Sequence, residues 1–144
     1  GSGSKTPPEK TVEVDFHGVL SLIETSERMN VRRFIMLSSM NTDDPETGPE
    51  KLRHYLNAKA GADARLRQSL MNWTIVRPGY LHDEPSHEML EIAPSLGPVG
   101  ENTRISREDV AKVMVACMAH DNTVNKTFDI IDGKTPLKEA LESI

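Results

Sequence analysis

The residues best suited to chemistry are a tyrosine and a lysine, four positions apart in the segment HYLNAK. Tyr55 and Lys59 share one face if residues 50–70 form the helix that their pattern predicts. A lysine ammonium beside a phenol favours the phenolate, which predicts a Tyr55 pKa below the ordinary value of about 10. Such a tyrosine can donate or accept a proton near neutral pH, and the hydroxyl of Ser39 could hold a substrate oxygen.

The elements that must position these groups are two short apolar segments on either side of that helix. Residues 33–39 and 73–79 read as strands buried on both faces, as in a parallel sheet. Ser38 and Ser39 close the first strand, and a Pro-Gly pair closes the second, where Gly79 would let the backbone approach a ligand. Open α/β sheets bind ligands at the carboxyl ends of their strands, so we expect both strand ends to border one site.

The rest of the pattern alternates helices with strands, which indicates parallel strands joined by helical crossovers. We therefore predict an α/β, Rossmann-like fold with helices on both faces of a parallel sheet, in a single domain over residues 1–144. Ser106, with Asp109 three positions later, is a helix-capping signature. The other expected elements are a helix over 12–29 ended by Asn30, an irregular segment over 80–105 with a candidate short strand at 88–93, a strand over 126–132 and a helix over 136–144.

The composition argues against several classes of protein. The chain has 144 residues and a net charge of −5, which argues against nucleic acid as a partner because phosphate binding needs a basic surface. Cys117 is the only cysteine, so we expect no disulfide within the chain, a buried inert thiol and a reducing, cytoplasmic location. No stretch has the roughly 18 apolar residues of a membrane helix, so no membrane partner is expected. Residues 82–87 contain metal-ligating side chains, but Pro85 prevents a regular helix and we expect no metal site.

The segments FIMLSS, HYLNAK, WTIVRPGYL, ISREDVAKVM and KTFDIIDG together resemble the atypical short-chain dehydrogenases/reductases. The resemblance is to NAD(P)-binding proteins related to NmrA-like regulators, biliverdin and flavin reductases, and sugar epimerases. It covers residues 10–141 and corresponds to the C-terminal two-thirds of such a protein. The implied cofactor is NADP or NAD, and the implied substrate is a small carbonyl or hydroxyl compound.

The resemblance also implies a role for each matching residue. Tyr55 would be the general acid or base, Lys59 would bind the nicotinamide ribose and lower the Tyr55 pKa, and Ser39 would orient the substrate. Asp15 stands where many relatives have asparagine, which leaves its role open. The other implied cofactor contacts are Ser38, Pro78, Gly79, Tyr80 and Leu81.

One family motif is absent from the sequence. The glycine-rich G-x-x-G-x-x-G turn that receives the dinucleotide pyrophosphate does not occur, nor does the residue that selects NAD or NADP. We therefore expect an incomplete Rossmann-like sheet that lacks its N-terminal βαβ half and binds a dinucleotide weakly on its own. Its open edge would pair with the missing segment or in a homo-oligomer. Residues 1–8 read as a loop, either native or left by cloning.

Alternatives remain open for the whole protein and for single residues. The leading function is an NAD(P)-dependent oxidoreductase or epimerase, with this fragment inactive alone. The alternatives are a non-catalytic, NmrA-like NAD(P) sensor and an assembly fragment that pairs through its sheet edge. For the single residues, Tyr55 could instead pack on Leu52, Lys59 could be solvated, Ser39 could bond to backbone, and Arg77 could pair with Asp83 or Glu84.

Overall fold

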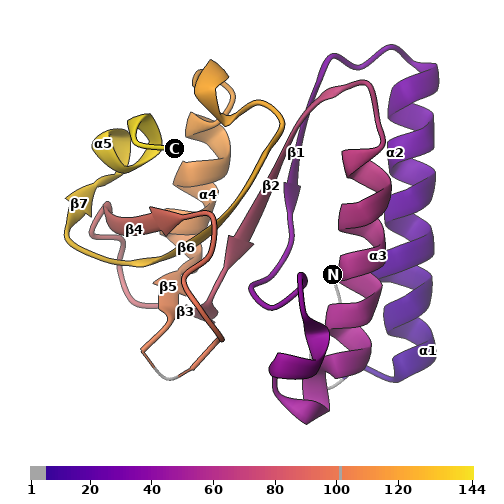
Figure 1. Ribbon diagram of the computed structural model, residues 1–144, viewed down its shortest axis with the longest axis horizontal. Coiled ribbons are helices and arrows are strands. Elements are labelled where there is room, and N and C mark those ends of the chain that lie inside the picture. The colour runs from indigo at the N-terminus through magenta and orange to yellow at the C-terminus, as the bar shows by residue number, and fades with distance from the viewer. Residues whose placement is uncertain (1–5, 101) are drawn as a thin grey trace.

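Strands with apolar residues on both faces form a sheet in the computed structural model, which describes residues 6–100 and 102–144 (Figure 1). The strands are β1 (Arg33–Leu37), β2 (Asn72–Pro78), β3 (Tyr80–His82), β4 (Met89–Ala93), β5 (Arg104–Ser106), β6 (Lys126–Asp132) and β7 (Thr135–Pro136). The helices are α1 (Pro8–Thr11), a π-helical segment (Val12–Gly18), α2 (Val19–Arg28), α3 (Arg53–Arg67), α4 (Arg107–Ala116) and α5 (Leu137–Glu142). Short 3₁₀ turns occupy Pro45–Thr47, Glu50–Leu52 and Asp121–Thr123.

The main sheet has the strand order β1-β2-β6-β4-β7. The pairs β1–β2 and β2–β6 are parallel, as the sequence pattern predicts. The short strand expected near residues 88–93 is present as β4, but it pairs antiparallel with both β6 and β7. Among the described strands, β1 lies at the edge of the sheet, also as expected.

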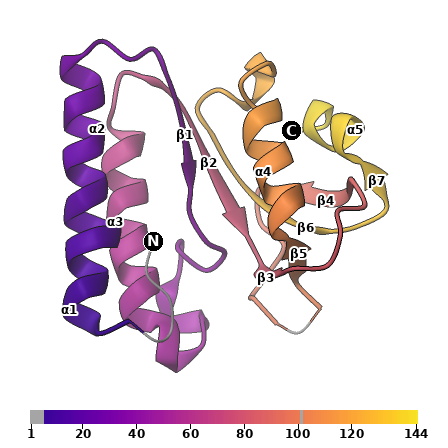
Figure 2. The ribbon, with the colours of Figure 1, turned by 180° about the vertical axis from the view of Figure 1, so that it is seen from behind.

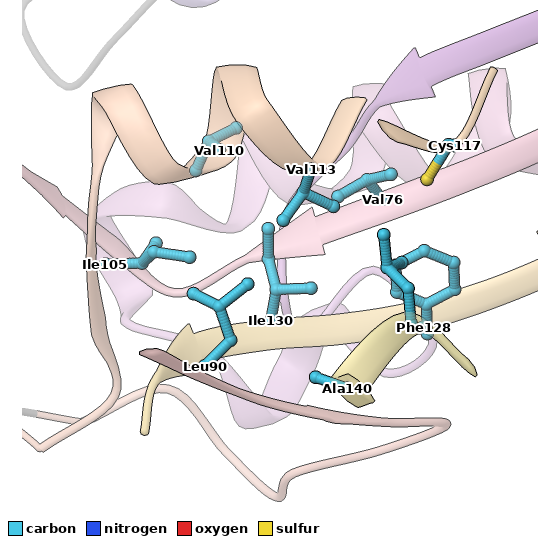
Figure 3. Packing of buried hydrophobic residues seen from close by; sticks show 10 residues of the cluster. Val76, Leu90, Ile105, Val110, Val113, Cys117, Phe128, Ile130 and Ala140 are labelled. Atoms are coloured by element: carbon cyan, nitrogen blue, oxygen red, sulfur yellow. The ribbon is translucent and has the colours of Figure 1, made fainter. Parts of the chain in front are cut away.

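Helices cover both faces of this sheet, which confirms the predicted layers (Figures 1 and 2). On one face, Ile23 of α2 and Leu66 of α3 are buried with Met36 and Ile75 of the strands. On the other face, α4 and α5 cover residues of the same strands and of β6, and Figure 3 shows this cluster. Successive strand side chains point to opposite faces, so β1 and β2 supply both layers. The second cluster contains Val76, Leu90, Ile105, Val110, Val113, Cys117, Phe128, Ile130, Ala140 and Leu141.

The first helix is longer and less regular than its sequence pattern indicates. It begins at Pro8, where a proline at the first helical position loses no needed hydrogen bond, and not at residue 12. It continues through the π-helical segment into α2. Asn30, with φ of 56°, takes the left-handed conformation that ends the helix, as predicted. Of the loop expected over residues 1–8, residues 1–5 lie outside the described part of the chain.

The segment over residues 80–105 is less irregular than predicted. Apart from β4, it holds β3 and β5, which pair in parallel as a separate small sheet. Strands of 3 residues are too short to show a hydrophobic period, which explains why the pattern missed them. The helix cap at Ser106 is confirmed, because its Oγ accepts a hydrogen bond of 2.9 Å from the Asp109 amide. No helix in the described ranges has the length and apolar character needed to cross a membrane.

Arg77 has a structural role, but its predicted partners are wrong. Its Nε donates to Asp129 on β6 at 2.6 Å, and both side chains are almost fully buried. Its Nη2 donates to the Pro94 carbonyl at 2.8 Å, and its Nη1 lies 3.4 Å from the carboxylate of Asp43. The expected partners Asp83 and Glu84 instead pair with arginines of the segment 104–107. Sequence proximity is a poor guide here because Arg77 and Asp129 meet only through the β2–β6 register.

Replacing Asp129 with alanine is expected to lower the free energy of unfolding by about 3–5 kcal/mol, because it removes the only buried carboxylate that the described residues place against the Arg77 guanidinium and leaves the half-exposed Asp43 as its counter-charge. The matched control is Asp43→Ala, which removes a half-exposed partner of the same arginine and should cost no more than about 1 kcal/mol. Urea unfolding of both variants measures the difference. Equal losses would show that burial does not decide the strength of these pairs.

Candidate functional site

A cavity of about 900 Å³ opens at the carboxyl ends of β1 and β2, beside the first half of α3. Its lining also includes Asp15 of the π-helical segment, and Arg107 at the start of α4. The structure brings together every residue that the sequence pattern and the resemblance assign to a site. Those lining residues are Ser38, Ser39, Tyr55, Lys59, Pro78, Gly79, Tyr80 and Leu81.

Backbone hydrogen bonds beyond β1 hold the two strand ends together. The Ser38 amide donates to the Val76 carbonyl at 2.7 Å, and the Met40 amide donates to the Pro78 carbonyl at 3.1 Å. The parallel ladder between β1 and β2 therefore continues past Leu37 into the segment that carries Ser39. This continuation fixes Ser39 on the same rim as Pro78 and the residues after it.

The two serines have different surroundings. The Ser38 side chain is buried, and its Oγ donates to Asp63 Oδ2 at 2.8 Å. Its hydroxyl proton is therefore committed to the protein. The Ser39 hydroxyl is half-buried, and it makes no hydrogen bond within the described part of the chain. Of the two hydroxyls, that of Ser39 is the one placed to contact a ligand in the cavity.

Tyr55 and Lys59 lie on one face of α3, as their spacing predicts. The Lys59 ammonium is 6.0 Å from the centre of the Tyr55 ring, and its Nζ donates to the Leu37 carbonyl at 2.7 Å. Lys59 is therefore not a solvated surface lysine. It contacts the last residue of β1 and ties α3 to the sheet.

The predicted lowering of the Tyr55 pKa is wrong for this structure. Burial, followed by the negative charges of Asp15 and Asp63, raises the pKa of Tyr55 to about 12. Burial also lowers the pKa of Lys59, although the same carboxylates oppose that effect. The sequence pattern pointed to the lysine alone, whereas the fold brings two carboxylates to the same place.

Asp15 is buried at 2% exposure because the π-helical segment packs tightly on α3. The contact depends on Gly61, where an added Cβ would lie 2.6 Å from the Phe16 ring. π-helical turns are rare in proteins, and those that occur are often found at functional sites. Here it carries an acidic side chain into the lining of the cavity.

Gly79 allows a close backbone approach, and its neighbour in this structure is another part of the chain. A Cβ at this position would lie 2.1 Å from the carbonyl oxygen of Thr103. The same carbonyl accepts a hydrogen bond of 2.7 Å from the Tyr80 amide. Close packing against Thr103, in the segment before β5, is therefore enough to require glycine at this position, independently of any ligand in the cavity.

Two polar residues that the sequence pattern did not assign to a site are Asn41, which lines the cavity, and Asp63, which binds the lining residue Ser38. Asp63 lies four residues after Lys59, on the same helix face, and this spacing was the available signal. Asn41 Oδ1 accepts from the Val99 amide at 2.9 Å, and its Nδ2 donates to Thr47 Oγ1 at 2.8 Å. The contact with Val99 joins loops that are 58 residues apart in the chain, and no local pattern reveals it.

The histidines and carboxylates over residues 82–87 do not gather around a common point. His82 Nε2 lies 2.9 Å from Asp132 Oδ2, and Glu84 pairs with Arg104. Within residues 6–100 and 102–144, no group of three histidine, cysteine, aspartate or glutamate side chains could hold a metal ion. Cys117 is fully buried, and burial raises the pKa of its thiol, which makes it unreactive.

Comparison with known proteins identifies the family to which the sequence of this chain is similar. A family model described as NAD(P)H-binding matches residues 1–121. An uncharacterized sugar epimerase of Bacillus subtilis is 39% identical over 144 residues, which are 100% of this chain and 65% of that protein. The chain therefore spans just under two thirds of the length of this relative.

Two solved structures share the fold over the whole chain. One, from Bacillus halodurans, carries a provisional assignment as an NAD-dependent epimerase/dehydratase and is 39% identical with a TM-score of 0.94. The other is the oxidoreductase ylbE from Lactococcus lactis, which is 32% identical with a TM-score of 0.86. This chain covers 66% of the first and 64% of the second. These likenesses confirm the predicted Rossmann-like α/β fold.

The raised Tyr55 pKa predicts a loss of stability in alkali. The folded-state pKa of about 12 lies above the unfolded value of about 10, so the stabilisation is complete below pH 10 and is lost as the pH rises to 12. The loss is expected to be about 3 kcal/mol at most. Urea unfolding between pH 9 and pH 12 measures it, and Tyr55→Phe should lack this part of the pH dependence. An identical pH dependence in the variant would contradict the raised pKa.

Proposed function

Because this chain belongs to the NAD(P)H-binding family, and its motifs are those of the atypical short-chain dehydrogenases/reductases, we propose that it carries the proton-transfer site of an NAD(P)-dependent oxidoreductase or epimerase. The observation that carries the proposal is one cavity lined by Ser39, Tyr55 and Lys59 together with the end of β2. The proposed substrate is a small carbonyl or hydroxyl compound, and the activity is that of the whole protein to which this chain contributes.

The cavity suits the nicotinamide half of a dinucleotide. Its volume of about 900 Å³ falls within the range of small-molecule sites. Lys59 has three N–H donors, of which one goes to Leu37, and an ammonium of this kind can hold ribose hydroxyls. Pro78, Gly79, Tyr80 and Leu81 would lie along the nicotinamide side. When bound, the nicotinamide would supply or accept a hydride.

Tyr55 is proposed to move the proton. A phenol with a pKa of about 12 stays protonated at neutral pH, so it is ready to donate. An alkoxide that develops on a carbonyl carbon during reduction is more basic than a phenolate, and proton transfer from Tyr55 to it is downhill. In the oxidative direction the same oxygen would receive the proton.

Ser39 and Lys59 are proposed to prepare that transfer. The Ser39 hydroxyl, at the rim beside Pro78, would donate to the substrate oxygen and keep it facing Tyr55. The Lys59 charge would stabilise the phenolate left after proton donation. In this scheme, Ser38 contributes through its backbone and through its bond to Asp63, because its hydroxyl proton is already committed.

Replacing Tyr55 with phenylalanine is expected to lower cofactor-dependent turnover of a small carbonyl substrate by about 10²–10⁴-fold, the usual contribution of a positioned proton donor. Nicotinamide absorbance measures the turnover of the protein that carries this chain. Lys134→Met serves as the control, since Lys134 is exposed and lies outside the cavity lining. Unchanged turnover in the Tyr55→Phe variant would refute the role of Tyr55. If the unmodified protein itself bound the cofactor without any turnover, the NAD(P)-sensing alternative would be favoured.

Lys59→Met is expected to weaken binding of nicotinamide mononucleotide, which carries the half of the cofactor that the cavity suits. Without a glycine-rich turn in the sequence, binding to this chain should be weak, and amide chemical shifts can follow it. The largest shifts should fall on Ser39 and Gly79. The loss of a charged hydrogen bond predicts about a tenfold higher Kd. Equal affinity in Lys59→Met and Lys134→Met would remove Lys59 from the binding site.

A further inference from the structure

Asp63 is a buried carboxylate on the same face of α3 as the proposed proton-transfer residues. Tyr55, Lys59 and Asp63 follow one another at intervals of four, so their side chains form one row along the helix. The Asp63 side chain is 1% exposed. Its neighbours Ala62 and Leu66 are apolar core residues, so packing alone does not require a charge at this position.

One oxygen of this carboxylate ties α3 to the segment after β1. Asp63 Oδ2 accepts from Ser38 Oγ and from Thr42 Oγ1, each at 2.8 Å. Both donors are buried, and Ser39 lies between them in the chain. The carboxylate therefore holds the segment 38–42 at two points. Because the β1–β2 ladder holds the other side of this segment, Ser39 has little freedom to move.

The second oxygen has no such explanation. Asp63 Oδ1 is buried and makes no hydrogen bond among the described residues. A buried polar atom without a partner costs roughly 1–3 kcal/mol, and native proteins retain few of them. An asparagine or a threonine could tie the segment at a lower cost in desolvation, so the charge itself requires a reason.

The charge faces the groups of the proposed site. Lys59, Tyr55 and Arg67 share α3 with it, and Asp15 approaches from the π-helical segment. Burial raises the pKa of Asp63, whereas the hydrogen bonds from Ser38 and Thr42 lower it. The charge of Asp63 in turn raises the pKa of Lys59 against the effect of burial, and it raises that of Tyr55.

We propose that Asp63 is a positioning residue of this site, which fixes the segment carrying Ser39 against α3 and places a buried negative charge on the helix face of Lys59 and Tyr55, about one turn from the lysine and two turns from the tyrosine. The charge favours the ammonium form of Lys59 and the phenol form of Tyr55, which is the pair that proton donation requires. The catalytic meaning of this arrangement rests on the proposed function. Two parts of the proposal are independent of that function: the tether, which is the pair of hydrogen bonds from Ser38 and Thr42 to Asp63, and the charge coupling, which is the effect of the Asp63 charge on Tyr55. Both can be tested without cofactor or substrate.

The charge coupling is tested by titrating the Tyr55 phenol in the Tyr80→Phe background, where Tyr55 is the only tyrosine. With a pKa of about 12, roughly a tenth of Tyr55 is phenolate at pH 11, and ultraviolet difference absorbance measures this fraction. Adding Asp63→Asn keeps an oxygen for Ser38 and Thr42 but removes the charge, which is the smallest of the three causes of the raised pKa, so the fraction should rise about two- to threefold. Adding Thr42→Val, which keeps the charge, should leave it unchanged. If circular dichroism shows that the Asp63→Asn protein is folded and its phenolate fraction is unchanged, the coupling is overturned.

The tether is tested separately in the double variant Ser38→Ala, Thr42→Val, which keeps the carboxylate. The Met40 amide, bonded to the Pro78 carbonyl, should exchange its hydrogen at least threefold faster than in the unmodified protein. The Ile75 amide, within β2, is the internal reference and should exchange at its former rate. This variant remains informative if Asp63→Asn does not fold at high pH. Unchanged exchange at Met40 would overturn the positioning role.

The outcomes of these experiments and of the Tyr55→Phe assay are independent. If Tyr55→Phe leaves turnover unchanged while Asp63→Asn raises the phenolate fraction, the proposed function fails and the charge coupling stands. If Tyr55→Phe abolishes turnover while both Asp63 measurements show no change, the proposed function stands and the role of Asp63 is refuted.

Discussion

The parallel pairing of β1 with β2 is the constraint on which the rest of the site depends. Leu37 lies opposite Val76 in the register, and the backbone hydrogen bonds continue past it to Pro78. A shift of one residue would turn the apolar side chains of both strands to the wrong faces and would move Ser39 away from the β2 end. The core layers on both faces therefore also fix the position of the cavity.

Buried charges connect the elements around this sheet. The Arg77–Asp129 pair joins β2 to β6, and Asp63 joins α3 to the segment after β1. The two have different chemical surroundings. The charge of Asp129 is matched by a guanidinium at 2.6 Å, whereas among residues 6–100 and 102–144 Asp63 receives only hydroxyl hydrogen bonds, and its Oδ1 has no hydrogen-bond partner there. An incompletely matched charge on the same helix face as Lys59 and Tyr55 affects their protonation more than it adds stability.

The sequence predicted the fold, and it selected residues that line one cavity, because both depend on local pattern. Strand 126–132 has its predicted bounds, and Ser39, Tyr55 and Lys59 follow from strand ends and helix spacing. The pKa of Tyr55 could not be predicted in this way, because it depends on burial and on carboxylates from distant positions. The antiparallel direction of β4 and the partners of Arg77 likewise depend on three-dimensional register, which one sequence does not reveal.

The contacts of Arg77 have a consequence for how this family can vary. One guanidinium binds β6 through Asp129, the loop at Pro94 and the loop at Asp43, each along a different N–H direction. A lysine would keep the charge, but its single ammonium lacks the planar fork that serves all three segments. Evolutionary drift should therefore accept exchange of the exposed Asp43 more readily than arginine-to-lysine exchange at Arg77. Loss of this arginine would require compensating changes at the buried Asp129 of β6 and in both loops at once.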